Sequence, residues 1–196
     1  IKDFKPDSII ACYDLPEKTF RHEAYEAYKG GRGKTDDELV LQLESSRSIF
    51  EAFNIPIYDK VGFEADDILG TIVEETLDNK DVEIVIASGD MDTMQLISGD
   101  KVVVYTLKKG IKDTVTYNED AMRDRFGFGP ELLPDYKGLR GDPSDNIMGV
   151  PGIGEKTGTI LISNFGTVEN ILDLAKNNPD KLKEVGIKDR IVGLLV

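Results

Sequence analysis

The sequence has little of the chemistry that cysteine and histidine supply. Its 196 residues include one cysteine, one histidine and no tryptophan. Cys12 alone cannot build a disulfide framework or a thiolate metal site, and its place in an apolar run predicts a buried, inert thiol in a reducing cytosol. His22 is the single imidazole, so triad or acid–base chemistry built on histidine is poorly supported. We expect His22 to be a surface or packing residue.

Long apolar runs are also missing. No stretch approaches the ~20 apolar residues needed to cross a bilayer, so we do not expect this chain to be a membrane protein. The chain begins Ile1-Lys2-Asp3, without an initiator methionine or a signal peptide, which predicts a piece of a longer protein. A hydrophobic fraction of 40% with 31% charged residues is ordinary for a globular chain, here long enough for one well-buried domain with a small appendage.

Basic charge is scarce. Lysine and arginine number 24 against 37 acids, which gives a formal net charge of -13. Nucleic-acid binders usually carry a basic face, so this total first argues against a polyanionic partner. Two interpretations remain open: an acidic, well-solvated surface, or carboxylates that converge on cations and make the formal charge overstate the negative field. The positions of the acids along the chain must decide between them.

The order of predicted elements is strand, helix, strand, followed by short helices. Apolar runs predict buried strands at 8–13 and 82–87, and a hairpin of strands at 102–105 and 114–117. A capping box of Thr35 and Glu38 opens a helix that ends before Asn54, with Leu39, Leu43 and Phe50 at helical spacing. Further helices are expected over 64–79, 118–126, 130–139, 155–165 and 167–176. The order implies an α/β fold, a parallel sheet flanked by helices, with a helical appendage.

Acidic residues gather where the predicted strands end. Functional groups in open parallel sheets collect at the carboxyl ends of the strands. Acids occur there, at the start of the helix at 64–79 and in a loop after a later helix: Asp14, Glu64, Asp66, Asp67, Asp90, Asp92, Asp142 and Asp145. Taken singly, each acid can be explained by a purely structural role, as a helix cap or as a charge in the first turn of a helix.

A shared pocket would change that balance. Carboxylates ~4 Å apart repel by ~4 kcal/mol per pair at an effective dielectric of about 20, so a cluster binds either protons or hard cations. Oxygen-only ligands favour Mg²⁺ or Mn²⁺ over zinc. Two such ions ~4 Å apart can activate a water and stabilise a leaving oxygen in phosphodiester hydrolysis. A metal-activated water as nucleophile also fits the lack of histidine.

Two segments have the composition of nucleic-acid contacts. Residues 20–34 interleave Arg, Lys and Tyr, which suits single-stranded nucleic acid, although a solvated loop is the alternative. Arg21, Lys29 and Arg32 are best placed there to neutralise phosphate. Residues 149–157 form a glycine-rich hairpin entering a helix, where backbone N–H groups and Lys156 can bind phosphate. A plain interhelical turn remains the alternative.

Five motifs in order, at 20–29, 64–67, 89–92, 141–146 and 149–157, resemble the bacterial 5′–3′ exonuclease domain. That domain forms the N-terminal part of DNA polymerase I and belongs to the flap endonuclease family. The resemblance runs from about Asp7 to Lys176. It implies a PIN-like α/β core at 1–117, with an arch at 15–35, and a helical DNA-binding part at 118–196. The latter contains a helix–three-turn–helix, or helix-hairpin-helix, element at 147–166.

The resemblance also implies an activity. It implies Mg²⁺-dependent cleavage of 5′ flaps and of DNA from 5′ ends, as in Okazaki primer removal and repair. Two or more Mg²⁺ ions would serve, with Mn²⁺ as a substitute. The expected setting is the bacterial cytoplasm, at the nucleoid, with a polymerase domain in the same parent chain.

The family's functional residues transfer by position. Asp14, Glu64 and Asp66 match one metal site; Asp90, Asp92, Asp142 and Asp145 match the other; Asp67 is an additional bacterial-type acid. The arch residues that hold the scissile phosphate and the threaded strand match Arg21, Tyr28, Lys29 and Arg32. The hairpin that holds duplex backbone, and that can also hold K⁺, matches Gly149, Gly152, Ile153, Gly154, Lys156 and Thr157.

The chain departs from the family at several positions. The family's first strand carries an acidic metal ligand, and the sequence has no residues before Ile1 that could supply it. This fragment is therefore expected to cleave DNA weakly or not at all. Met91 stands where a lysine is usual, and Met148 where a proline is usual. Gly158 replaces an alanine, which lowers helix stability by up to ~1 kcal/mol. Two other functions stay open: a catalytically weak DNA-binding module of the same family, and a small-molecule phosphatase. A phosphatase of this kind usually has a second aspartate close to the one after its first strand, and the sequence has no such partner next to Asp14.

Overall fold

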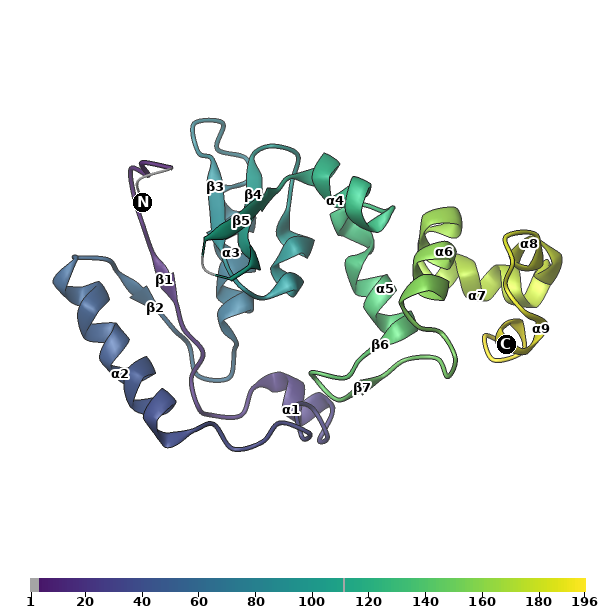
Figure 1. Ribbon diagram of the computed structural model, residues 1–196, viewed down its shortest axis with the longest axis horizontal. Helices are drawn as coiled ribbons and strands as arrows, with labels where there is room; N and C mark the ends of the chain where they lie inside the picture. The colour runs from purple at the N-terminus through teal and green to yellow at the C-terminus, as the bar shows by residue number, and fades with distance from the viewer. Residues whose placement is uncertain (1–3, 111) are drawn as a thin grey trace. The chain divides into compact units, whose positions relative to one another are not determined.

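The computed structural model describes residues 4–110 and 112–196. The chain divides into two compact units, Ile1–Glu75 and Thr76–Val196. Figure 1 shows their elements, and each unit is described by itself. Within the described residues no helix is both long and apolar enough to span a membrane.

The first unit is built around a short parallel strand pair. Strand β1 (Ala11–Cys12) pairs with β2 (Ile57–Tyr58), with Ala11 opposite Ile57. Helix α1 (Phe20–Ala24) and helix α2 (Asp37–Ala52) lie between them in the chain, and α3 (Ala65–Thr76) follows β2. The strand predicted at 8–13 is therefore confirmed in place but is shorter than expected. Cys12 is half-buried rather than buried, and this burial raises the pKa of its thiol.

Helix α2 differs most from its prediction. Its N-cap is Asp36, whose carboxylate accepts the backbone N–H of Glu38 at 2.8 Å, so the predicted capping box at Thr35 is wrong by one residue. No residue of α2 is buried, and Leu39 and Leu43 are about half exposed (48% and 51%). Helical periodicity shows only that two side chains share a face, not that anything covers that face.

The C-terminal half of α2 makes the packing contacts of this helix, and most of them are with Tyr13. The ring of Phe50 meets that of Tyr13 edge-on at 6.1 Å between centroids, and the Arg47 guanidinium lies 4.6 Å from the Tyr13 ring centroid. The Tyr13 hydroxyl also hydrogen-bonds Ser46. Arg47 pairs with Asp59 at 2.6 Å. The C-terminal half of α2 is thus held to the strand pair.

The second unit begins with a three-stranded sheet. Strand β3 (Ile84–Ala87) pairs in parallel with β4 (Val102–Lys109), and β4 pairs antiparallel with β5 (Asp113–Tyr117). The predicted strand at 82–87 and the hairpin are confirmed. A 3₁₀ segment, η1 (Met91–Leu96), leads from β3 toward β4. Val102 and Val104 are fully buried, as is Met94 of η1, and they form the core beneath the sheet.

Helices make up most of the rest of this unit, as predicted (Figure 1). They are α4 (Glu119–Phe126), η2 (Pro130–Leu132), α5 (Leu133–Arg140), α6 (Glu155–Phe165), α7 (Val168–Asn177), α8 (Pro179–Glu184) and α9 (Asp189–Val192). Their shared core includes the buried side chains of Leu139, Leu161, Ile171 and Leu182. The last two helices were not predicted because they are too short, at 6 and 4 residues, to show a period. A two-residue antiparallel pair, β6 (Gly141–Asp142) with β7 (Ile147–Met148), connects α5 to the hairpin before α6.

Candidate metal centre and nucleic-acid interface

Three acids from two parts of the second unit come together. Carboxylate oxygens of Asp92, Asp142 and Asp145 all lie within 4.8 Å of one another. Asp92 stands in the first turn of η1, five positions after Ala87 ends β3. Asp142 ends β6, and the turn that follows returns the Asp145 N–H to the Asp142 carbonyl at 3.2 Å. The predicted convergence of distant acids is therefore present within this unit.

Asp90 has a different place. Its carboxylate caps η1 by accepting the Asp92 backbone N–H at 2.9 Å, and its own N–H donates to the Ser88 hydroxyl at 3.0 Å. It lies outside the group of three carboxylates that the described residues form. A ligand role for Asp90 stays a prediction, and its observed contact positions Asp92.

A lysine that the sequence did not single out completes the cluster. The Lys137 ammonium, on α5, donates to Asp142 at 2.6 Å and also to Asp92. Asp142 further accepts the backbone N–H and the hydroxyl of Ser144, at 2.9 and 2.5 Å. Lys137 lies in the last turn of α5, five residues before Asp142, a position that is ordinary for a lysine and gave no signal in the sequence.

Burial and hydrogen bonding within the cluster shift the pKa values of its acids. Burial raises the pKa of Asp92, against the opposing hydrogen bond from Lys137. Burial also acts to raise the pKa of Asp142, but the hydrogen bonds from Lys137 and Ser144 outweigh it and lower that pKa to about 2. At neutral pH Asp142 is thus an anion that already has a cationic partner.

The donor set fits a divalent cation. Carboxylate oxygens are the ligands preferred by hard ions such as Mg²⁺ and Mn²⁺, and three of them converge here. The Lys137 ammonium, between two of these oxygens, shows that they accept a cation in this geometry.

The acids of the first unit gather where α3 begins. Asp14, after β1, accepts the backbone N–H of Ala65 at 2.7 Å, and Asp67 accepts that of Glu64 at 2.9 Å. Asp66 is half-buried in the same first turn of the helix. The helix N-terminus favours these negative charges. The four acids predicted for this part of the chain are neighbours in the structure.

The basic residues predicted to hold phosphate are paired with these acids. Arg21 makes two hydrogen bonds to Asp67, at 2.7 and 2.8 Å, and Lys29 donates to Glu64 at 2.8 Å. The Arg21 hydrogen bond lowers the pKa of Asp67, against a smaller effect of burial. Lys29 has a φ of 55°, a left-handed backbone conformation that costs a non-glycine residue ~1–2 kcal/mol. The fold therefore directs this cation toward the acids at some energetic cost.

A pocket of about 220 Å³ opens beside this group. Its lining includes Asp14, Lys29, Arg32 and Glu64, with His22 at its wall. Two predicted metal ligands and two predicted phosphate-binding cations thus share one concave site. Arg32 is exposed, so its guanidinium is the most accessible of the three predicted cations.

Two residues of the arch have packing roles. Tyr28 is only 6% exposed, and its hydroxyl donates to Glu64 at 3.1 Å. Its ring is not open for stacking on a base, which corrects the expected nucleic-acid contact of Tyr28, whereas Tyr25 of the same segment is 42% exposed. His22 packs edge-on against Tyr28 at 5.2 Å, and its Nδ1 accepts the Thr19 N–H at 3.1 Å. The predicted packing role of His22 is confirmed.

The glycine-rich hairpin is shaped by close backbone contacts within the protein. A Cβ on Gly149 would lie 2.2 Å from the Gly141 nitrogen, so this glycine makes room for the neighbouring chain. Gly152 has a φ of 89°, which only glycine adopts easily. Ile153 is 4% exposed and anchors the turn from inside, which makes it a poor direct contact for DNA.

The exit of the hairpin keeps the features of a phosphate site. Gly154 is the N-cap of α6 and provides no side-chain cap among the described hydrogen bonds, and a Cβ there would meet nothing within 4 Å. Helix starts leave backbone N–H groups without an intrahelical partner, here those of Glu155, Lys156 and Thr157. Lys156 is exposed and Thr157 half-buried. A phosphate role for these residues stays a prediction.

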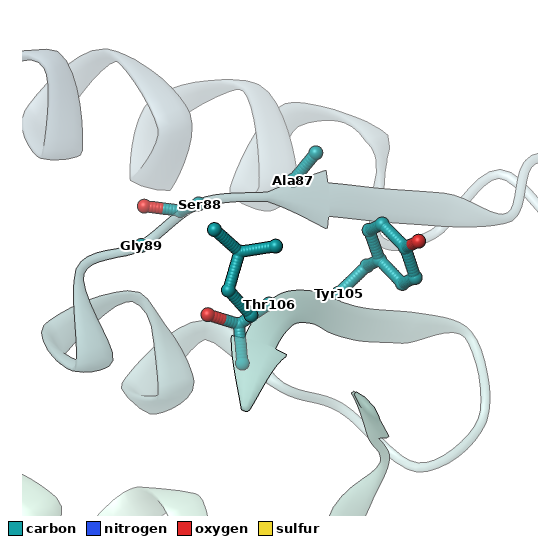
Figure 2. Close-up of a pocket in the computed structure, with 6 residues that line it drawn as sticks. Ala87, Ser88, Gly89, Tyr105 and Thr106 are labelled. Atoms are coloured by element: carbon teal, nitrogen blue, oxygen red, sulfur yellow. The ribbon is translucent and has the colours of Figure 1, made fainter. Parts of the chain in front are cut away.

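A second pocket, also about 220 Å³, lies at the carboxyl end of β3 and is lined in part by Ala87, Ser88, Tyr105 and Thr106. Figure 2 shows Ser88 just beyond the end of β3, across from Thr106 on β4. No charged side chain lines this pocket. It is therefore distinct in chemistry from the acid cluster that follows it in the chain.

The Arg21–Asp67 pair predicts an acid-sensitive stability. The folded-state pKa of Asp67 lies below its ordinary value of 3.8, so the native state binds this proton less readily than the unfolded chain does. The stabilisation is fully present well above pH 3.8 and is lost as pH falls through the lower, folded pKa. We expect Asp67→Asn to flatten the acid side of the curve of unfolding free energy against pH, measured by urea denaturation. The exposed Asp7→Asn should keep the original slope; an unchanged slope in Asp67→Asn would contradict the pairing.

The fold and the acids define a known class of protein: the chain belongs to the 5′–3′ exonuclease family. Residues 1–127 match the 5′–3′ exonuclease N-terminal resolvase-like domain, and residues 128–191 match the 5′–3′ exonuclease C-terminal SAM fold. The match confirms the predicted family and the α/β fold with a helical C-terminal part. The family models divide the chain at 127/128, whereas the boundary predicted from the sequence lies at 117/118.

Individual relatives agree with the family. DNA polymerase I of Bacillus caldotenax is 44% identical over 192 residues, 97% of this chain and 22% of the relative. DNA polymerase I of Bacillus subtilis is 40% identical over 185 residues, 94% of this chain and 21% of the relative. The chain thus spans about a fifth of the length of these curated relatives.

Solved structures share the fold over almost the whole chain. The T5 5′-exonuclease with bound zinc is 26% identical, with a TM-score of 0.75, and the match covers 99% of this chain and 74% of that one. A bacteriophage T5 flap endonuclease variant, in a pseudo-enzyme-product complex with DNA and metal ions, is 26% identical, with a TM-score of 0.74 and the same coverage.

Proposed function

We propose that this chain hydrolyses DNA phosphodiester bonds at 5′ flaps and 5′ ends, with divalent metal ions as cofactors. The observation that carries the proposal is the convergence of Asp92, Asp142 and Asp145 within 4.8 Å, in a chain of the 5′–3′ exonuclease family. The similar T5 proteins with bound zinc, and with DNA and metal ions, support the same assignment.

The cofactor in the cell is proposed to be Mg²⁺, with Mn²⁺ as a working substitute. All the candidate ligands are carboxylates, which favour these ions over zinc. When bound, such ions supply Lewis acidity toward a water and toward the phosphate oxygens. The residues that would hold them are Asp92, Asp142 and Asp145 in one unit, and Asp14, Glu64 and Asp66 in the other. K⁺ at the hairpin 149–157 belongs to the same proposal.

The chain's cations have the complementary task. Arg21 and Lys29 already stand at hydrogen-bond distance from Asp67 and Glu64, and Arg32 lines the same pocket. A phosphate that entered beside these acids would find guanidinium and ammonium donors in place to bind its oxygens and neutralise its charge. The backbone N–H groups at the start of α6 and Lys156 would hold duplex phosphates.

The biological context follows from the same assignment. The relatives at 44% and 40% identity are DNA polymerases I that extend far beyond this chain, so a polymerase domain in the same parent protein is the proposed partner. Primer removal and repair in the bacterial cytoplasm, at the nucleoid, would then be its setting.

The test is cleavage of a duplex carrying a 5′ flap labelled at its 5′ end. With the full-length parent protein, we expect release of the labelled flap with Mg²⁺ or Mn²⁺, and loss of that release when EDTA is added. A duplex with a 3′ flap of the same sequence is the matched substrate control and should not be cut at the flap. Cleavage that survives EDTA would refute the metal mechanism, and flap binding without turnover at any metal concentration would favour a binding module.

A further inference from the structure

Lys137 belongs to the acid cluster, and the proposed reaction gives it no role. Its ammonium donates to both Asp92 and Asp142, while Asp145 completes the group of three carboxylates. The side chain is 29% exposed, against 11% for Asp142, so solvent reaches Lys137 more readily than its partner. The cluster thus carries a cation of its own.

The position of this cation overlaps with that of a metal. A divalent ion needs the same carboxylate oxygens that Lys137 binds. A protonated amine has three donors and no lone pair, so it cannot become a metal ligand and competes with an arriving ion for the lone pairs of those oxygens. Two cations at ~4 Å also repel, which adds to the exclusion.

We propose that Lys137 is a tethered counter-ion, which competes with the divalent metal for Asp92 and Asp142 and is released when the metal binds. In the metal-free protein it neutralises acids that would otherwise repel one another. The flexible four-carbon stem lets the ammonium move into solvent without moving α5. Lys137 then sets the affinity and the threshold concentration of the metal. The inference rests on the proposed function, because it requires that this cluster bind a metal.

The first test measures Mn²⁺ affinity by calorimetry, without DNA. Lys137→Met keeps an unbranched side chain, one atom shorter, and removes the charge, and we expect it to bind Mn²⁺ about tenfold more tightly or better. Lys137→Arg keeps a competing cation and should bind Mn²⁺ as weakly as the unaltered chain does. Lys181→Met, at an exposed lysine on α8, is the matched control and should bind as the unaltered chain does. Asp145→Asn identifies which of the binding events belongs to this cluster.

The second test needs no change at Lys137. Amine acetylation of the unaltered chain, followed by peptide mass spectrometry, reports how freely each lysine reacts. We expect Mn²⁺ to speed acetylation of Lys137 several-fold and to leave that of Lys181 unchanged, and Asp145→Asn to weaken the effect. This measurement stands even if Lys137→Met does not fold.

The outcomes separate the two proposals. Equal Mn²⁺ affinity in the unaltered chain and Lys137→Met, or acetylation of Lys137 that is unchanged or slowed by Mn²⁺, overturns the counter-ion role and leaves the metal site intact. Mn²⁺ binding to neither protein removes the metal site and, with it, this inference. Tighter binding in Lys137→Met together with metal-enhanced acetylation supports both.

Discussion

Asp142→Asn should lower metal-dependent flap cleavage by about 10²–10³-fold, because a metal supplies several kcal/mol of transition-state stabilisation and this change removes a ligand. Asparagine keeps the shape of the side chain and an oxygen for the Ser144 N–H, at present 2.9 Å from the carboxylate. The change removes the negative charge of a side chain that is 11% exposed and paired with Lys137. The effect should therefore fall on metal affinity and turnover before it falls on the fold.

The measurement is single-turnover cleavage over a range of Mg²⁺ concentrations. Asp124→Asn, at an exposed position on α4, is the matched control and should cleave at the original rate. Circular dichroism establishes that both variants fold. Wild-type cleavage by Asp142→Asn at low Mg²⁺ would mean that the cluster of three acids does not take part in the reaction.

Gly149→Ala should destabilise the second unit by about 3 kcal/mol, since forced overpacking costs ~1–3 kcal/mol and here backbone must move. The new Cβ would lie 2.2 Å from the Gly141 nitrogen and 2.3 Å from the Arg140 carbonyl carbon. Neither atom belongs to a flexible side chain. The chain after α5 would have to separate from the hairpin, and with it the turn that carries Asp142 and Asp145.

Urea denaturation measures this change. Gly154→Ala is the matched control, because a Cβ at Gly154 meets nothing within 4 Å. We expect it to cost only a few tenths of a kcal/mol to ~1 kcal/mol, as an N-cap change. Equal stability of the two variants would show that the close approach of Gly149 to Gly141 is not a constraint on the fold.

The acids could be predicted from the sequence because their chemistry and their position agree. Asp92 follows a strand of apolar residues, and Asp142 follows a helix of clear period, so the topology alone suggested that they meet. Lys137 could not be found in this way. A lysine in the last turn of a helix is ordinary, since it favours the helix dipole, and only coordinates show the carboxylates around its ammonium.

Roles that depend on burial were equally hidden. Tyr28 and Ile153 were assigned to DNA contacts by composition and resemblance, yet they are 6% and 4% exposed. Gly149 was interpreted as an approach point for phosphate, but its missing side chain is used against Gly141. A sequence shows which residue type stands at a position, whereas what presses against it comes from residues that are distant in the chain.

The weak attachment of α2 has a consequence for motion. Every residue from 30 through 45 is exposed, while the contacts with Tyr13 involve Ser46, Arg47 and Phe50. A helix held at one end opens first at the other, because isolated turns are marginal in water. Local opening should therefore spread from Asp37 toward the anchored end. The segment that leads from the phosphate-binding cations into α2 can thus lengthen or shorten its free span while the strand pair stays intact.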